Sequence, residues 1–311
     1  MESLNRMAIE LADEALEFAD ELNVRAFDLD NGATVIDFGV DATGGIEAGL
    51  LLAELQTAGL ATVQTRMDEV GSVPFPHVEL TTDRPAHALL CAQKAGWELS
   101  VDGFEGLGSG PARALVAEET EFQVVGYTDA FDFAVLALEA ETFPTEAVAA
   151  HVADRAGVNP DGLFLPTFRT ASIAGSVSVA ARAAEVAVFR LFEEGYDPTD
   201  ILTATGSAPV SPVPESEETA IGRTNDTLAY GGQVHLTVAA DSELFPDLVS
   251  TAGDAYGRPF VDIFEDADLD FSAVDPSVFA PAQLTVDVVG GPTYAAGSVD
   301  DDLLLESFGL S

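Results

Sequence analysis

The segment Ser178-Val-Ala-Ala-Arg-Ala-Ala-Glu-Val-Ala-Val-Phe-Arg-Leu-Phe192 is the most informative stretch of this chain. It contains no glycine or proline, is rich in alanine and is followed by Gly195, so it predicts one helix over residues 178–194. Steps of three and four residues return to the same face of a helix. Arg182 and Glu185 therefore share one stripe of the predicted helix with two phenylalanines, and the adjacent stripe is apolar.

Two interpretations of this charged pair stay open. A buried charge costs several kcal/mol unless it is paired, and apolar replacement of a buried pair is often neutral or stabilising. Stability alone therefore does not explain a buried pair, and a functional role does. The alternative is a partly exposed pair on a helix surface, which contributes about 0.2–0.5 kcal/mol.

The composition predicts a folded protein adapted to high salt. The 311 residues are 47% hydrophobic and include 54 acidic and 12 basic residues, which gives a formal charge of −42 at pH 7. The acids are spread along the chain, and self-repulsion of this size is tolerated when molar salt shortens the Debye length to about 3 Å. We therefore expect a cytoplasmic protein of a salt-accumulating halophile. Nucleic acid is excluded as a partner, because the chain lacks the basic face that phosphate binding needs.

Cysteine and histidine usage argues against a metal centre. Cys91 is the only cysteine, so intrachain disulfides and multi-thiolate zinc sites are excluded. His87 lies four residues before it, but two ligands make a poor metal site, and we expect both to be core or surface residues. The N-terminal segment resembles an acidic amphipathic helix and not a signal peptide, and no apolar segment is long enough to span a membrane. We expect no membrane association.

Hydrophobic periodicity predicts a mixed α/β fold of two domains. Helices are predicted at residues 4–23, 47–57, 86–94, 145–156, 178–194 and 247–255. Strands are predicted at residues 24–29, 33–40, 61–65, 97–101, 133–138, 162–166, 228–230, 234–239 and 282–289. Residues 73–80 contain two prolines and predict an edge strand or an extended loop. We expect a loop directly after the 178–194 helix, containing Pro209, Pro212 and Pro214, and a loosely held acidic tail after residue 297. We place the first α/β domain at residues 1–120 and the second at 121–311, and segments of the two can interleave.

Three polar segments are candidates for ligand binding. Lys94, next to Gln93, is the only lysine, and its ammonium suits an anionic group or, alternatively, the end of a helix. The glycine-rich segment Gly106–Arg113, which contains Ser109, precedes a predicted helix. It favours a local anion site or an ordinary turn, and matches neither a Walker loop nor a dinucleotide fingerprint. Asn225 and Asp226 lie in a predicted polar loop that could bind a heterocycle.

Eight segments, in this order along nearly the whole chain, resemble the methenyltetrahydromethanopterin cyclohydrolase family. They are Asn31-Gly-Ala-Thr-Val-Ile-Asp37, Glu47-Ala-Gly-Leu50, Gly59-Leu-Ala-Thr-Val63, Gln93-Lys-Ala-Gly-Trp97, Gly108-Ser-Gly-Pro-Ala-Arg-Ala114, Thr224-Asn-Asp226, Tyr230-Gly-Gly232 and Phe279-Ala-Pro281. The resemblance implies two α/β domains with a large cleft between them, a homotrimer, and no metal or prosthetic group. It implies that Arg182 and Glu185 match the active-site Arg-x-x-Glu of the family.

The resemblance further implies reversible hydrolysis of a methenyl bridge on a tetrahydromethanopterin carrier to the 5-formyl form. Glu185 is then the expected general base for water and Arg182 its orienting partner. Lys94 and Arg113 are the expected partners of the anionic part of the substrate. The alternatives are the same reaction on methenyl-tetrahydrofolate, an enzyme acting on the neighbouring formyl or methylene form, and a non-catalytic pterin- or nucleotide-binding protein.

Overall fold

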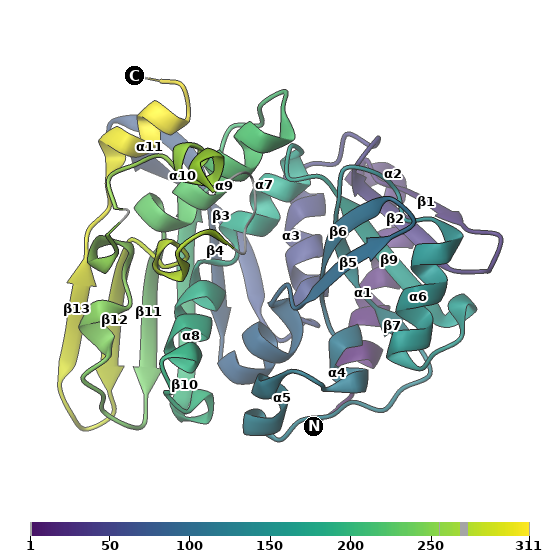
Figure 1. The fold of residues 1–311 in the computed structure, drawn as a ribbon, viewed down its shortest axis with the longest axis horizontal. Helices are drawn as coiled ribbons and strands as arrows, with labels where there is room; N and C mark the ends of the chain where they lie inside the picture. Colours follow the sequence, from purple (N-terminus) through teal and green to yellow (C-terminus); the bar gives the residue numbers. More distant parts are fainter. Residues whose placement is uncertain (1, 255, 268–272, 311) are drawn as a thin grey trace. The chain divides into compact units, whose positions relative to one another are not determined.

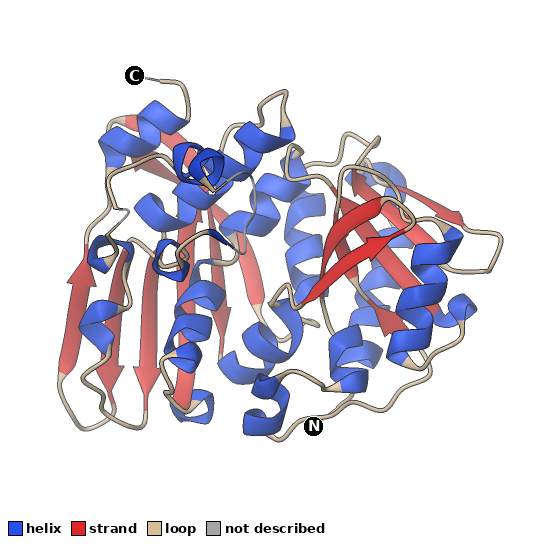
Figure 2. Cartoon of the chain, in the orientation of Figure 1, coloured by secondary structure: helices blue, strands red, loops and turns tan. Residues whose placement is uncertain are grey.

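The computed structural model describes residues 2–254, 256–267 and 273–310, and it confirms the mixed α/β class (Figures 1 and 2). The chain divides into two compact units. Unit 1 comprises Met1–Thr62 and Ala86–Ser178, and unit 2 comprises Val63–Pro85 and Val179–Ser311. The division therefore differs from the domain boundary placed at residue 120. Residues 121–178 belong to unit 1, because the strands in that stretch pair with strands from the first part of the chain.

Unit 1 contains a seven-stranded sheet. Its order is β1 (Arg25–Asp28), β2 (Thr34–Gly39), β9 (Leu163–Phe168), β8 (Ala137–Glu139), β6 (Phe104–Ser109) and β5 (Trp97–Val101), with β7 (Ala134–Val135) also paired to β9. Strand β9 runs parallel to β2, β7 and β8, whereas the hairpins β1–β2 and β5–β6 are antiparallel. The sheet is therefore mixed, with its parallel part in the middle.

Two apolar cores cover the two faces of this sheet, because successive strand residues point to opposite sides. Val135 and Ala137 join the core formed with α1 (Leu4–Glu17) and α3 (Ile46–Gln56). Leu136 and Leu138 join the other core, formed with α6 (Glu146–Ala156). The remaining helical segments of unit 1 are α2 (Ala19–Leu22), a π-helix (Ala86–Gln93), α4 (Ala112–Val116), α5 (Thr120–Val125), a 3₁₀ turn (Pro160–Gly162) and α7 (Ile173–Ala180).

Unit 2 contains a six-stranded sheet. Its order is β13 (Thr293–Gly297), β12 (Gln283–Val288), β11 (Gln233–Val238), β10 (Ile201–Pro209), β4 (Val73–Thr82) and β3 (Thr62–Val70). Helix α8 (Ala183–Glu193) packs on β10 and β11, and α9 (Glu217–Gly231) packs on β10 (Figure 1). Helices α10 (Phe260–Asp266) and α11 (Asp301–Ser307) in turn pack on α9. The 3₁₀ turns of this unit are Pro198–Asp200, Phe245–Asp247, Ser250–Ala252 and Pro276–Val278.

Strand β10 was expected to be a loop. It is central in its sheet, but its inward positions are Ala204, Gly206 and Ala208, so its inward face lacks the branched and aromatic residues that identify buried strands. Strand β4 is likewise not an edge strand, because it pairs with β10 over His77–Thr82, after both of its prolines.

Three predictions for the C-terminal half were also wrong. The predicted strand at residues 228–230 lies inside α9, whose helical pattern is weakened by internal glycines but whose N-terminus is capped by Ser216. The predicted helix at 247–254 consists of 3₁₀ turns, and residue 255 lies outside the described residues. The acidic tail is ordered as α11, because Asp300 caps it and Leu304 is buried against α9.

Asp37 organises the loop that follows β2. Its side chain is buried, and its two carboxylate oxygens accept hydrogen bonds of 2.7–3.2 Å from the backbone N–H groups of Gly39, Val40, Asp41 and Ala42. A buried carboxylate needs such donors, and hydrogen bonds to charged groups are stronger than those between neutral groups. One side chain therefore holds four consecutive residues of backbone.

We predict that Asp37→Asn lowers the free energy of unfolding by about 2–3 kcal/mol, because the amide nitrogen replaces one acceptor and faces two N–H donors. Denaturant unfolding in molar KCl measures the change. Asp41→Asn is the matched control, since Asp41 lies in the same loop with an exposed side chain. Equal stability of the two variants would contradict the structural role of Asp37.

Candidate active site

The predicted continuous helix over residues 178–194 is interrupted at the charged pair. Helix α7 ends at Ala180, a turn follows, and α8 begins at Ala183. Arg182 occupies the cap position of α8 with φ −92° and ψ 0°, and its backbone N–H donates to Val179 at 2.9 Å. Ser178 is the last residue of unit 1, so the break falls where the chain passes from one unit to the other. Alanine-rich composition predicted the helices but not this turn.

Glu185 lies in the first turn of α8 and is 3% exposed. Both Nε and Nη2 of Arg182 lie 3.0 Å from the same carboxylate oxygen, Oε2. Among the residues that the structure describes, no donor to the other oxygen, Oε1, is found. The Arg182 guanidinium and the N-terminal end of the helix are two sources of positive charge near the Glu185 side chain. Arg182 therefore engages only one of the two carboxylate oxygens of Glu185.

Lys94 and Arg113 form a buried ion cluster in unit 1 with Glu119 and Glu121. The Lys94 ammonium pairs with Glu121 and lies 3.4 Å from Glu119. Arg113 donates from Nε to Glu119 at 3.0 Å, pairs with it again through Nη2, and lies 3.6 Å from Glu121. Two cations and two carboxylates balance, so the cluster carries no net formal charge.

Arg113 also holds the end of the π-helix. Its side chain is fully buried, and Nη1 donates to the carbonyl oxygens of Leu90, Ala92 and Lys94 at 2.8–3.3 Å. Burial by itself would raise the pKa of Glu119, but the hydrogen bonds and charge of Arg113, with the charge of Lys94, hold it below the ordinary value. Arg113 is thus a structural residue in this conformation, and Lys94, with a side chain 19% exposed, is the more accessible cation.

The glycine-rich segment does not form the expected turn. Gly106 and Gly108 lie in strand β6, and the helix after Pro111 is only five residues long. Ser109 is buried and accepts a hydrogen bond of 2.9 Å from Gln56, which accepts one of 2.8 Å from Ser178. Gln93 is also fully buried. Unit 1 therefore holds Lys94, Gln93, Arg113 and Ser109 at the π-helix and the strand beside it.

Asn225 and Asp226 lie on helix α9 and not in a loop. Asn225 donates from Nδ2 to the carbonyl of Ile221 at 2.9 Å. Asp226 is buried, and its carboxylate accepts from the backbone of Phe260 at 2.8 Å and from the hydroxyl of Ser307 at 2.7 Å. It therefore joins α9 to the start of α10 and the end of α11, and this role was not visible in the sequence.

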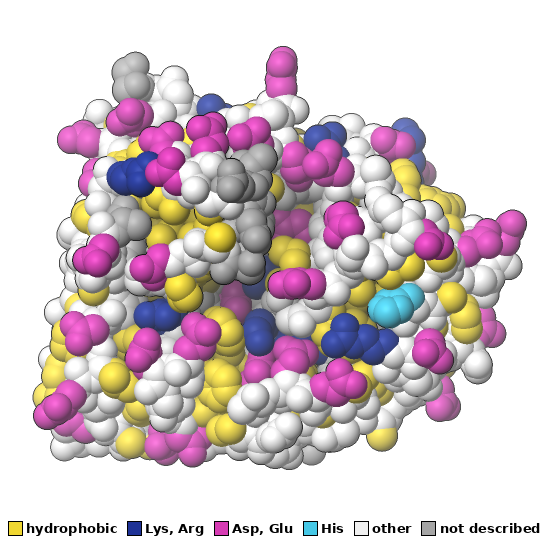
Figure 3. Space-filling view, viewed as in Figure 1, with side chains coloured by type: hydrophobic (Ala, Val, Ile, Leu, Met, Phe, Trp, Pro, Cys, Tyr) yellow, Lys and Arg dark blue, Asp and Glu magenta, His cyan; other side chains and the backbone are white. Residues whose placement is uncertain are grey.

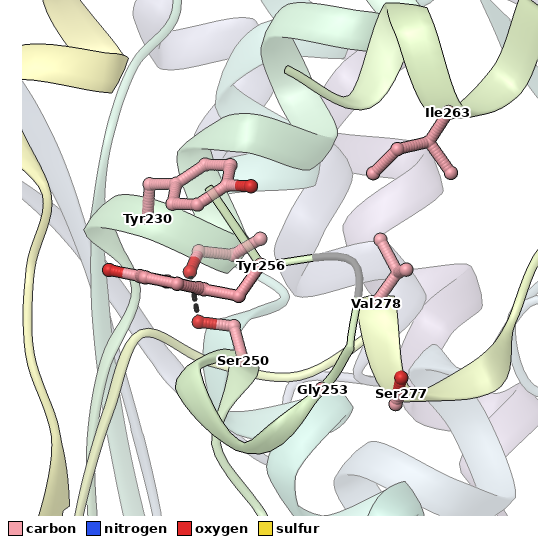
Figure 4. Close-up of a pocket in the computed structure, with 8 residues that line it drawn as sticks. Tyr230, Ser250, Gly253, Tyr256, Ile263, Ser277 and Val278 are labelled. Atoms are coloured by element: carbon pink, nitrogen blue, oxygen red, sulfur yellow. Dashed lines mark hydrogen bonds between the residues drawn. The ribbon is translucent and has the colours of Figure 1, made fainter. Parts of the chain in front are cut away.

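Tyr230, near the other end of α9, lines a small hollow of unit 2 (Figure 4). Its hydroxyl donates to the carbonyl of Arg258 and accepts from the backbone N–H groups of Gly257 and Arg258. Ser250, which also lines the hollow, donates its hydroxyl to the carbonyl of Ala229 (Figure 4). The polar groups of this hollow thus hold Ser250, Gly257 and Arg258 against helix α9.

Sequence reasoning missed Glu119, Glu121 and Gln56. The two glutamates were hidden among the 54 acidic residues, and only their contact with the sole lysine distinguishes them. Cys91 is fully buried, and burial raises the pKa of its thiol to about 12, so it supplies no thiolate near neutral pH. Among the described residues, no three His, Cys, Asp or Glu side chains gather as metal ligands would.

The surface agrees with the acidic composition. Figure 3 shows Asp and Glu side chains scattered over the drawn face instead of gathered in one patch. Within the described part of the chain, no helix has both the length and the apolar character that crossing a bilayer requires.

We predict that Asp226 makes stability fall as pH rises. Burial raises the pKa of Asp226 to about 7 from its ordinary 3.8, against the hydrogen bonds from Ser307 and Phe260, which lower it. Between these values the folded state binds a proton that the unfolded state has lost, so this contribution is full below pH 4 and lost by about pH 7. Asp226→Asn should therefore gain stability relative to the native chain between pH 5 and pH 8, measured by denaturant unfolding at constant salt. Glu218→Gln, an exposed change on the same helix, should show no such trend.

Known proteins match this chain over its whole length. A family model described as Cyclohydrolase (MCH) matches residues 3–308. A Halobacterium salinarum protein named methenyltetrahydromethanopterin cyclohydrolase is 66% identical over 311 residues, and the alignment covers all of both chains. Proteins of the same name from Methanocella arvoryzae and Methanospirillum hungatei are 41% and 39% identical, with at least 99% of each chain covered. These matches confirm the resemblance drawn from the motifs: the chain belongs to the MCH cyclohydrolase family.

Proposed function

We propose that this chain hydrolyses the methenyl bridge of a 5,10-methenyl-tetrahydropterin of the tetrahydromethanopterin type to the 5-formyl form, reversibly. Family membership and the names of the relatives support the substrate class. The observation that carries the mechanism is the buried Glu185 carboxylate, which Arg182 engages through Oε2 alone. Glu185 Oε1 is the oxygen that we assign as the general base.

The reaction balances because it consumes one water and releases one proton. Glu185 Oε1 takes a proton from water as the oxygen bonds to the cationic methenyl carbon, which forms a neutral carbinol adduct. Glu185 then returns that proton to N10 as the carbon–N10 bond breaks. The hydroxyl proton of the adduct leaves to solvent as the C=O bond of the 5-formyl group forms.

The negative charge of Glu185 also favours the substrate electrostatically, because the methenyl bridge carries a delocalised positive charge. Burial makes that attraction stronger than at the surface, and it protects the attraction from screening by salt. Arg182 has a positioning role in this scheme. Its two donors on Oε2 fix the orientation of the carboxylate, so that Oε1 stays directed toward the reacting water.

We propose Lys94 as the residue that meets the anionic part of the substrate, in preference to Arg113. The Lys94 side chain is 19% exposed, whereas that of Arg113 is fully buried and committed to backbone carbonyls and Glu119. Gln93 and Ser109 are buried at the ends of the π-helix and of strand β6, and we propose that they contribute to the same binding region. The resemblance also implies a homotrimer in the cytoplasm of a salt-accumulating cell, and these remain predictions that sedimentation in molar KCl and cell fractionation test.

The deciding assay adds purified protein to methenyl-tetrahydromethanopterin and to methenyl-tetrahydrofolate in molar KCl. Loss of the methenyl absorbance on the first carrier supports the proposed function, and loss only on the folate carrier reassigns the substrate. Binding of the carrier without loss of absorbance would identify a non-catalytic pterin-binding protein. Turnover that requires a redox cofactor would indicate the neighbouring step of the pathway.

We predict that Glu185→Gln lowers turnover by about 10²–10⁴-fold while the methenyl substrate still binds, because the amide has no proton-accepting charge. Steady-state kinetics in molar KCl separate the fall in kcat from any change in KM. Glu193→Gln is the matched control on the same helix, since Glu193 is exposed and pairs with Arg190 at the surface. Near-native turnover of Glu185→Gln would refute the assignment of the base.

A further inference from the structure

Gly206 lies in strand β10, in register with Leu80 of β4 and Val234 of β11. It is buried, and its φ is not in the left-handed region, so the backbone conformation itself does not require glycine. Space requires it. A Cβ atom at this position would lie 2.5 Å from the backbone nitrogen of Ala184 and 2.9 Å from the Ala184 Cβ.

This contact is with a helix backbone and not with a flexible side chain. Ala184 is fully buried and is the second residue of α8, directly before Glu185. Protein interiors are close-packed, so a methyl group placed there forces the strand and the first turn of the helix apart. The displacement reaches Glu185 through one peptide unit.

The surroundings offer no easy relief. On either side of Gly206 the same face of β10 carries Ala204 and Ala208, both fully buried. The facing side of α8 carries Ala187 and Leu191, also fully buried. Strand β10 is hydrogen-bonded to β4 and β11 along both of its edges. A Cβ atom at residue 206 would therefore displace the helix and not the strand.

We propose that Gly206 is a positioning residue, which sets how closely the first turn of α8 approaches the sheet and so places the Glu185 carboxylate. The inference rests on the proposed function, in which Glu185 is the base. Gly206 touches no reacting atom in this scheme and acts only through Ala184. A displacement of about 1 Å in a catalytic group can cost about 10²-fold in rate.

The experiment compares Gly206→Ala, Glu185→Gln and the double variant with the native enzyme in molar KCl. We expect Gly206→Ala to lower kcat by about 10–100-fold and to change KM by less than about threefold. Because Gly206 acts through Glu185, the double variant should retain the residual kcat of Glu185→Gln alone, without a further loss. A purely structural role would not produce this non-additivity.

Gly222→Ala is the matched control. Gly222 is a buried glycine of α9 in the same unit, where a Cβ would lie 3.0 Å from the Val261 Cβ, but it faces α10 and not α8. This variant should keep native kcat. If Gly206→Ala does not fold, Ala184→Gly combined with Gly206→Ala removes the side-chain contact and leaves the backbone contact. The same loss of kcat is then expected, with Ala184→Gly alone as its reference.

Several results would overturn the inference. A folded Gly206→Ala with native kcat would show that the contact does not place the base. Additive losses with Glu185→Gln, or an equal loss in Gly222→Ala, would show a general effect on the unit. If the native enzyme hydrolyses neither methenyl carrier, the proposed function itself fails. If Glu185→Gln alone is active, the assignment of the base fails and Gly206 has no base to position.

Discussion

The close approach of helix α8 to strand β10 is the contact on which the candidate catalytic geometry depends. The helix begins with two small residues, Ala183 and Ala184, each at most 1% exposed. The strand meets it with Gly206, where no side chain fits. Side chains this small allow two backbones to pack nearly in contact, and such contacts have little freedom to relax. The position of the Arg182–Glu185 pair at the start of this helix therefore depends on how closely the helix packs against the sheet.

Charge is distributed in two distinct ways in this molecule. Most acidic residues of the described part of the chain are not buried, so salt screens their mutual repulsion. A few of the 12 basic residues are instead buried or half-buried with carboxylate partners: the fully buried Arg113 and the half-buried Lys94 in one cluster, and the half-buried Arg182 with Glu185. Buried ions are costly unless every donor is used. Arg113 meets this condition through three backbone carbonyls, so it organises the π-helix, whereas Glu185 leaves one oxygen without a donor among the described residues.

The elements that could be predicted from sequence are those whose own residues carry a pattern typical of that element, such as alternation in a strand or capping residues at the ends of a helix. Strand β5 was predicted at its observed limits, because alternation between Trp97, Leu99 and Val101 identifies a half-buried strand. Helix α6 follows from Thr145 as its cap and Gly157 as its end. The same reasoning gave a wrong prediction for strand β10. Its small inward residues are explained by the helix that packs closely on them, and they do not form a pattern typical of a strand.

The sequence by itself determined the fold class, the adaptation to salt and, through ordered motifs, the family. Composition and the order of motifs are properties of the chain that do not depend on how it packs. The sequence also placed Arg182 and Glu185 side by side, since a spacing of three residues keeps them neighbours whether the helix is continuous or begins between them. Only the tertiary structure decided that the helix breaks at Arg182, that Arg113 is committed to Glu119 and three carbonyls, and that Asp226 joins three helices. These outcomes depend on groups that lie far apart along the chain or on different elements. No local pattern encodes which of many carboxylates will meet a given cation when the chain packs.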